Sequence, residues 1–477
     1  MKLKPRRILV LVTGGVLAAG GGAAAWKMSA TRGQIRAALP PAPAVAARPE
    51  EFRTRLATAQ ARAAGWGGAA AFGELSRLYH ANGFLREAMQ CYAALETLEP
   101  AEPRWLHRHA ALLAGFGEAE PAITRWDRVR TLAPEYWPAQ LRLGDLFLKT
   151  NRTVEAVAAF AAVLRREADQ PHALFGLARL DLDAGRWTEA RTKLETVVTK
   201  TRYALGYDLI VTVHEHFGDL ERAAEIRGRA KASGAYRDAA DPWLDELAND
   251  CYDVYRLALD AGLAARSGDP ATARRLLERA VSLAPDDPAV RFQLAGVLTE
   301  RHDLVGARRE LERCTQINPA FSDAWAHWAA LLQQAGDTAG AARLVAAGLQ
   351  KCPDSAGLHL MRARQLRDSG RPTEAIAAFQ AAIGFRPNEA DAYLELATTL
   401  FRLERVGEGV PWLERGLAAE PEHPPTLALL ALHAIGTGDP VAARGWMERV
   451  HRQPRVPAEQ VAKLRAAFQA QFGRTAP

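Results

Sequence analysis

The sequence predicts an all-α fold, a solenoid built from stacked pairs of helices. Three observations lead to this prediction. Alanine recurs every 34 residues in two long runs, proline recurs with the same spacing at another place in the period, and a small residue stands twelve positions before the alanine in all units but one. A fixed period of this length is typical of helical repeats, in which each repeat packs against its neighbours.

The proline column tests the period best, because alanine is common throughout this chain. Proline makes up only 27 of the 477 residues, yet five prolines stand in register in the second half. They are Pro285, Pro319, Pro353, Pro387 and Pro421. The alanine column comprises Ala88, Ala122, Ala156, Ala190, Ala223, Ala273, Ala307, Ala341, Ala375 and Ala443, with Gly409 in the one remaining slot. The repeat is therefore real.

Each unit has the same internal pattern. A small residue such as Ala110 or Gly144 precedes a polar or glycine-containing turn, and the alanine follows the turn. Small side chains at two facing positions let antiparallel helices approach closely. Glycine in the turn, as in Asn82-Gly83, supplies the left-handed residue that ends the first helix. The pattern predicts a helix-turn-helix in every unit.

This pattern resembles the tetratricopeptide repeat, a 34-residue helix-turn-helix with small residues at its eighth and twentieth positions. Aromatic or leucine side chains also match the fourth, seventh and eleventh positions of that family, as in Phe72, Leu75 and Tyr79. The resemblance extends from residue 69 to about residue 457. It implies a right-handed superhelical solenoid of about eleven repeats.

The repeats divide the chain into segments. We expect a signal anchor or signal peptide at 1–28, a proline- and alanine-rich linker at 29–50, a leading helix at 51–68, repeats 1–5 at 69–237, an insertion at 238–253, repeats 6–11 at 254–457, and a capping helix with a tail at 458–477. The insertion is acidic and carries Trp243, Leu244 and Leu247. It predicts a lengthened helix or an extra turn.

The amino terminus favours export. Residues 1–7 carry four positive charges, and residues 8–26 contain no ionisable side chain, which is just enough for a helix to span a bilayer. We expect an anchor in the inner (cytoplasmic) membrane with the body on the periplasmic side. The alternative is a signal peptide cleaved at Ala23-Ala24-Ala25, which would release the body into the periplasm.

Charge and missing motifs limit the classes of function. The first 36 residues hold seven basic side chains and no acid, which leaves a formal net charge of −1 for the other 441 and gives no support for nucleic-acid binding. The sequence has no Gly-rich phosphate loop, His-Glu-x-x-His or CxxC motif. We therefore expect no enzyme, no cofactor, no metal and no small-molecule substrate. A bridge between Cys314 and Cys352 stays open, because the sequence does not give the Cα separation.

The resemblance implies a binding groove on the concave face, built from the second, fifth, ninth and twelfth positions of each first helix. Arginine and histidine dominate these positions in the early repeats. The candidate groove residues are Arg77, His80, Arg104, His107, Phe175, Arg179, Arg364 and Arg367, with Arg108 and Arg142 one residue off this stripe. Because guanidinium groups bind carboxylates bidentately, the groove suits an acidic segment or a carboxyl terminus of a partner.

Two functions agree with these features. The first is a membrane-tethered scaffold outside the cytoplasm that binds peptide segments of envelope proteins and assists assembly. The second is a cleaved periplasmic protein that binds carbohydrate and supports polysaccharide or cell-wall assembly. Several tryptophans, Trp126, Trp325, Trp328 and Trp412 among them, stand at or beside packing positions, which favours the first function.

Overall fold

The computed structural model describes residues 26–230, 234, 238–453, 456 and 458–473. Every regular element in these residues is a helix, and the single β contact among them is an isolated bridge between Tyr203 and Gly234. The predicted all-α fold is confirmed. The helices form two compact units, which we call unit 1 (residues up to 285) and unit 2 (residues from 286).

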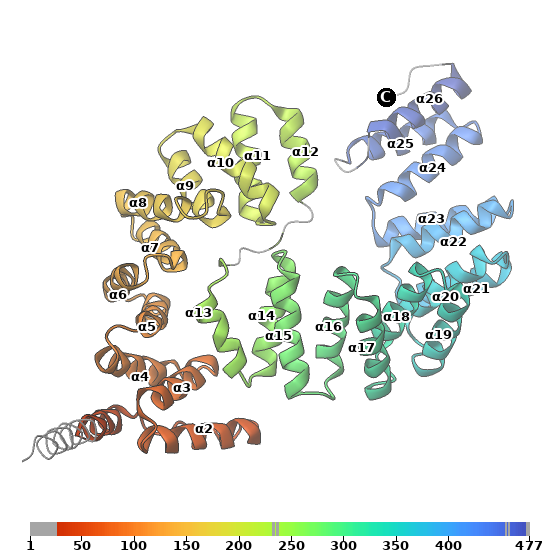
Figure 1. Ribbon diagram of the computed structural model, residues 1–477. Helices are drawn as coiled ribbons and strands as arrows, with labels where there is room; N and C mark the ends of the chain where they lie inside the picture. The colour runs from red at the N-terminus through yellow and green to blue at the C-terminus, as the bar shows by residue number, and fades with distance from the viewer. Residues whose placement is uncertain (1–25, 231–233, 235–237, 454–455, 457, 474–477) are drawn as a thin grey trace, which may run out of the picture. The chain divides into compact units, whose positions relative to one another are not determined.

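Unit 1 contains a leading helix before the first repeat, five helix pairs, and then a sixth pair (Figure 1). The leading helix is α2 (Glu50–Ala64). The five pairs are α3 (Gly68–Ala81) with α4 (Leu85–Leu98), α5 (Pro103–Gly115) with α6 (Ala119–Leu132), α7 (Trp137–Lys149) with α8 (Thr153–Leu164), α9 (Pro171–Asp183) with α10 (Trp187–Lys200), and α11 (Ala204–His216) with α12 (Leu220–Ala230). The sixth pair is α14 (Val254–Arg266) with α15 (Pro270–Leu283).

Unit 2 holds five further pairs and a final helix. The pairs are α16 (Pro288–Glu300) with α17 (Leu304–Ile317), α18 (Ser322–Gln334) with α19 (Thr338–Lys351), α20 (Ala356–Asp368) with α21 (Pro372–Phe385), α22 (Ala390–Arg402) with α23 (Val406–Ala419), and α24 (Pro424–Gly436) with α25 (Pro440–His451). The final helix is α26 (Ala458–Phe472), whose Leu464 and Phe468 are buried in the same core as α24 and α25. The two units together contain the predicted eleven pairs.

Small residues allow the two helices of a pair to touch. Ala88, Ala122 and Ala156 of the alanine column are fully buried. Gly144 shows the constraint most directly, because a Cβ added there would lie 2.5 Å from the ring of Phe160 on the paired helix. The small-residue columns read from the sequence therefore mark the helix-helix contacts of the structure.

The turn inside each pair has one residue with left-handed backbone, and this residue recurs in all eleven pairs. Glycine occupies the position in eight of them. Asn151, His302 and Glu404 occupy it in the other three, with φ of 59°, 61° and 60°. A side chain makes this conformation unfavourable, so these three turns carry local strain.

The chain before the leading helix differs from the linker that we expected at 29–50. Residues 26–38 are helical, and Ile35 is fully buried against the core of α2 and α3. The helix continues until Leu39-Pro40-Pro41 because proline cannot extend it. The extended linker is limited to the residues between this helix and α2.

The predicted membrane segment at residues 8–26 falls almost wholly outside the described residues. Among the residues that the structure describes, no helix combines the length and the apolar character needed to cross a bilayer.

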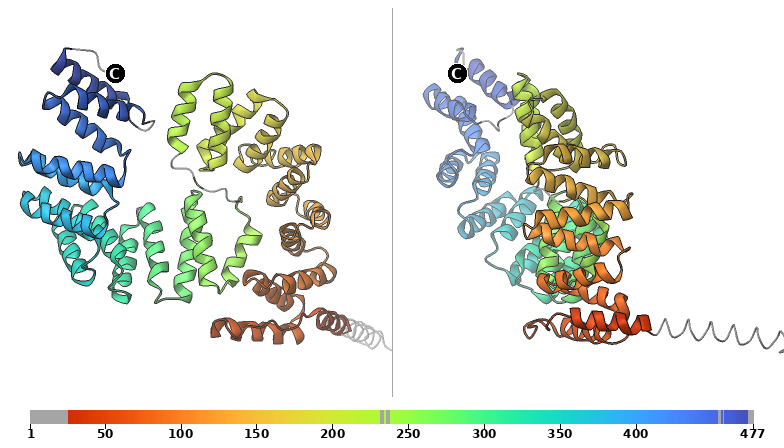
Figure 2. Two further views of the ribbon diagram at one scale, coloured as in Figure 1. Left: turned by 180° about the vertical axis from the view of Figure 1, so that it is seen from behind. Right: turned by 90° about the vertical axis from the view of Figure 1, so that its left-hand side faces the viewer.

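The insertion forms two short helical turns rather than a lengthened repeat helix. They are α13 (Pro242–Asp245) and the 3₁₀ turn η1 (Glu246–Asp250). The side chain of Asp241 caps α13 by accepting from the backbone N–H of Leu244. The left-hand view of Figure 2 shows α13 beside α14, and α13 also contacts α5.

Candidate peptide-binding groove

The first helices of repeats 1–3, which are α3, α5 and α7, present their predicted groove residues to one segment of the same chain. This segment is residues 238–253, which we call the strap. Its contacts follow the order α7, α5, α3 from its amino to its carboxyl end. The strap therefore runs across the first helices of all three repeats.

Asp241 of the strap is the most deeply held acid in this groove. The side chain is 2% exposed, and its two oxygens accept from His107 Nε2 at 2.8 Å and from the Tyr136 hydroxyl at 2.6 Å. Trp126 Nε1 donates to His107 Nδ1 at 3.1 Å. Because an indole N–H can only donate, His107 Nδ1 must accept, and the ring proton therefore lies on Nε2 and points at Asp241.

The pKa of Asp241 reports how well the groove satisfies a carboxylate. Burial alone would raise this pKa, but the hydrogen bonds from His107 and Tyr136 and the charge of Arg142 outweigh burial and lower it to about 2. The same carboxylate, together with burial, raises the pKa of the Tyr136 hydroxyl. The groove therefore stabilises the ionised acid strongly.

Trp243 of the strap packs flat on Tyr136. The two ring centroids are 3.5 Å apart and the rings are 7° from parallel, while His107 meets Trp243 edge-on at 5.6 Å. The backbone N–H of Trp243 also donates to the Tyr136 hydroxyl at 3.1 Å. Tyr136 thus binds an aromatic side chain and a backbone amide of the strap at once.

One arginine from each of the three repeats binds a further acid of the strap. Arg108 is 1% exposed and donates to the backbone carbonyl of Trp243 at 2.9 Å and to Glu246 Oε2 at 2.7 Å. Arg142 on α7 pairs with Asp238. Arg77 on α3 pairs with Asp250 at 2.9 Å. The arginines thus bind carboxylates, as guanidinium groups do, but the acids belong to this chain; the predicted binding of a partner's acidic segment stays a prediction.

Asn82, at the carboxyl end of α3, hydrogen-bonds the backbone of the strap. Its Nδ2 donates to the carbonyl of Asp250 at 2.8 Å, and its Oδ1 accepts from the N–H of Tyr252 at 2.8 Å. Asn82 is buried, so both contacts are shielded from water. Paired contacts of this kind are independent of the strap's side chains and suit any extended peptide.

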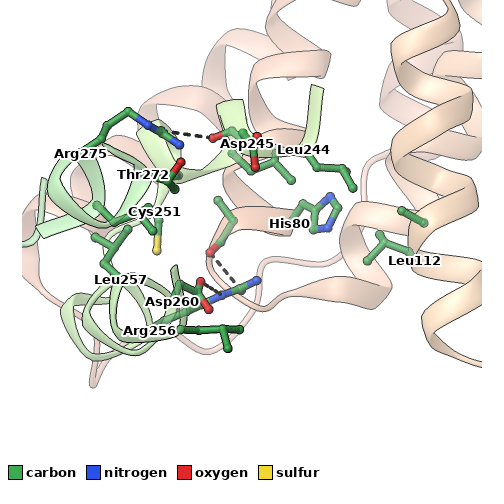
Figure 3. Close-up of a pocket in the computed structure, with 16 residues that line it drawn as sticks. His80, Leu112, Leu244, Asp245, Cys251, Arg256, Leu257, Asp260, Thr272 and Arg275 are labelled. Carbon is green, nitrogen blue, oxygen red and sulfur yellow. Dashed lines mark hydrogen bonds and ion pairs between the residues drawn. The ribbon is translucent and has the colours of Figure 1, made fainter. Parts of the chain in front are cut away.

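A cavity of about 320 Å³ lies between the strap, the groove helices α3 and α5, and the pair α14 and α15 (Figure 3). Leu244, Leu247 and Cys251 of the strap form one wall, while side chains of α3, α5, α14 and α15 form the others. Arg256 and Arg275 also line it, and Arg256 donates to the carbonyl of Ala81 at 3.2 Å. Apolar side chains of the strap thus border a cavity that the groove helices share with α14 and α15.

The other predicted groove residues do not contact the strap's acids. His80 lines the cavity and hydrogen-bonds Tyr92, and burial with the charges of Arg256 and Arg108 lowers its pKa to about 3. Arg104 binds Glu102 at the start of its own helix. Phe175 is buried and Arg179 lies over its ring at 6.0 Å.

In unit 2, Arg364 and Arg367 share one carboxylate. Arg364 Nε donates to Glu395 Oε1 and Arg367 Nη1 donates to Glu395 Oε2, both at 2.9 Å. Glu395 lies on α22, the first helix of the next repeat. Both predicted arginines therefore bind an acid of the repeat array itself.

The sequence did not single out Asn82 or Tyr136 as groove residues. Asn82 stood in a turn, where its role as a helix terminator explained it, and Tyr136 preceded a helix. Only the folded path of the strap brings both to the groove. The four cysteines are free and buried, so Cys314 and Cys352 are not bridged. His214 and His216 make separate contacts, with Asp219 and Trp187 respectively.

The fold defines a class of protein, a helical-repeat scaffold, in which the strap lies against the first helices of repeats 1–3. The tetratricopeptide repeat family matches residues 107–171, 141–204, 264–331, 327–390 and 360–424. Since these ranges cover more than half of the chain, the protein belongs to the tetratricopeptide repeat family.

Comparison with curated proteins finds no match. Several solved structures are similar in fold. Yeast Tom70 is 14% identical, with 84% of this chain and 96% of Tom70 covered and a TM-score of 0.40. PilF of Pseudomonas aeruginosa is 16% identical, with 46% and 98% covered and a TM-score of 0.38. MamA of Desulfovibrio magneticus RS-1 is 17% identical, with 36% and 96% covered and a TM-score of 0.31.

Proposed function

We propose that this protein is a membrane-tethered scaffold outside the cytoplasm, which binds acidic peptide segments of envelope proteins in the groove of repeats 1–3. Protein-protein interaction is the general role of the repeat family to which the chain belongs. Binding by such a groove depends on shape and many weak contacts, so no residue has a catalytic role in this proposal.

The observation that carries the proposal is that the groove already holds a segment outside the repeats, the strap, through its carboxylates and its backbone. His107, Arg108 and Arg142 bind carboxylates of the strap, and Asn82 binds its backbone on both sides of Cys251. These contacts combine side-chain selectivity with backbone recognition, as peptide-binding surfaces do.

The tether and the compartment rest on the sequence. Four positive charges before an uncharged stretch of nineteen residues favour an anchor with its body outside the cytoplasm. Protease added to intact spheroplasts should digest the body of an exported chain. Full protection of the body would contradict this part of the proposal.

The groove assignment can be tested by cross-linking and recovery of the full chain from membranes. Arg77→Glu with Arg142→Glu reverses charge at two groove residues that keep partial exposure, 30% and 22% of their side chains. Arg402→Glu is the matched control, because Arg402 is an exposed arginine at the end of α22. We expect partners that the native chain and the control retain and the groove variant loses. The same partners with all three chains would contradict the assignment.

A further inference from the structure

We propose that the strap is an internal competitor for the groove. In this view the partner segment carries an acid, a tryptophan and a second acid in the order Asp-x-Trp-x-x-Glu, and it binds by displacing residues 238–253. The inference rests on the proposed function, because it names the partner chemistry and the regulation of the same groove.

The contacts of the strap define the partner segment. Asp241 fits between His107 and Tyr136, Trp243 lies flat on Tyr136, and Glu246 reaches Arg108. These three strap residues follow the spacing Asp-x-Trp-x-x-Glu. Each contact uses a different side-chain chemistry. A segment lacking one of the two acids would leave a buried donor of His107 or Arg108 without its acceptor, and a segment lacking the tryptophan would lose the stack on Tyr136.

The strap is held as a ligand rather than as part of the repeat array. It forms no helix pair, and its longest helical turn has five residues. Two of its acids are half exposed, Asp238 at 55% and Glu246 at 49% of their side chains. Leu244 and Leu247 line the cavity between the strap and its neighbours. Leaving the groove breaks the contacts with α3, α5 and α7, and also those that Arg275 and Arg279 of α15 make with the carbonyls of Asp245 and Cys251.

Competition between the strap and a partner follows simple arithmetic. A tethered segment has an effective concentration on the order of millimolar at its own site. If the strap is closed in 99 of 100 molecules, the apparent affinity for a partner falls about 100-fold. A native chain would then bind weakly, and loosening the strap would strengthen binding.

The test uses a fluorescein-labelled peptide with the sequence of residues 238–253, in which Cys251→Ser removes the thiol. Fluorescence anisotropy measures its binding to three full chains: the native chain, the strap variant Trp243→Ala with Glu246→Gln, and the control Glu300→Gln, which changes an exposed acid of unit 2. We expect the strap variant to bind at least tenfold more tightly than the native chain and the control. A peptide with alanine at the three recognition positions should not bind.

A charge exchange tests whether the peptide occupies the groove. Arg142→Glu, introduced into the strap variant, should weaken binding of the native peptide severalfold. A peptide carrying Asp238→Arg should bind this chain with the original affinity again, because Arg142 and Asp238 pair directly. No recovery would contradict the proposed register. Glu246→Gln alone serves as a milder strap variant should the double variant fold poorly.

The outcomes separate the two proposals. Equal, measurable binding to the native chain and the strap variant would overturn the competition and leave the groove function intact. Absence of binding to both, with faster amide exchange in the strap of the variant, would overturn the groove function itself. Unchanged amide exchange in the strap of the variant would overturn the competition, because the strap would then be held by other contacts.

Discussion

The two units use the same residue type for the same kind of contact but draw the acids from different places. In unit 1, Arg77, Arg108 and Arg142 bind carboxylates of the strap, which lies outside the repeats. In unit 2, Arg364 and Arg367 bind Glu395 of the neighbouring repeat. The five arginines thus all bind acids, but the arginine alone does not tell whether the acid belongs to the repeat array or to an inserted segment.

The depth of burial also differs between the two carboxylates. Asp241 is almost fully buried among His107, Tyr136 and Arg142, whereas the side chain of Glu395 keeps 20% of its exposure. Removing a buried acceptor leaves donors without partners in a dry site, while donors near the surface regain water. The following experiments exploit this contrast.

The largest effect should come from Asp241→Ala. Loss of this carboxylate leaves the donors of His107 and Tyr136 without an acceptor. We therefore expect unit 1 to lose about 3 kcal/mol of stability. Glu395→Ala should cost unit 2 about 1 kcal/mol, because Arg364 and Arg367 regain solvent. Urea denaturation combined with amide exchange resolved by segment measures both. Equal losses in the two units would contradict the contrast.

Low pH should lower the stability of unit 1 by protonating the carboxylate of Asp241. The pKa of Asp241 is lowered from an ordinary 3.8 to about 2 in the folded state, so its contribution is complete above pH 3.8 and is lost as the pH falls toward 2. By linkage this contribution is about 2 kcal/mol. Stability measured between pH 2 and pH 5 should show this slope in the native chain, and Asp241→Asn should lack it. An identical slope in both chains would exclude Asp241 as its source.

Asp145 on α7 should give the stability of unit 1 the opposite dependence on pH. Burial raises its pKa from 3.8 to about 6, against the lowering effect of Arg142 and with a further rise from Asp238. A raised pKa means that the acid favours folding below pH 3.8 and loses that advantage as the pH rises through 6. Asp145→Asn should therefore stabilise the chain at pH 7 by at most about 3 kcal/mol and leave it unchanged at pH 3. Thermal denaturation at the two pH values checks this, and a gain at pH 3 as large as that at pH 7 would refute it.

The smallest effect should come from the strained turns. Glu404 in unit 2 and Asn151 in unit 1 both have left-handed backbone where most repeats have glycine. Glu404→Gly should stabilise unit 2 by about 1 kcal/mol, and Asn151→Gly should gain less, because asparagine tolerates this conformation better. Melting temperatures of the two variants give the comparison. Destabilisation by Glu404→Gly would show that the side chain makes a compensating contact.

Local rules predicted the repeats well. Ala88 and Gly144 lie at helix contacts, and the left-handed turn residue recurs in every pair, because each feature depends on residues within one 34-residue unit. The sequence likewise indicated that Arg77, Arg108 and Arg142 would bind carboxylates, since that preference belongs to the guanidinium group itself.

The identity of the acids could not be predicted. Asp241 and Glu246 are more than 130 residues from His107 and Arg108, and their contacts depend on the path that the chain takes after α12. The insertion had no place in the repeat register, so its acidic character had no partner assigned to it. Ile35 is a similar case, because a proline-rich neighbourhood concealed a helix that ends just before the prolines.

The central claim is that groove side chains bind the strap, and amide exchange of single strap residues tests it most directly. The N–H of Trp243 donates to the Tyr136 hydroxyl, and the N–H of Tyr252 donates to Asn82. In the native chain both amides should exchange slowly. Tyr136→Phe should accelerate exchange of the Trp243 amide, and Asn82→Ala should accelerate exchange of the Tyr252 amide. Fast exchange of both amides in the native chain would contradict the account.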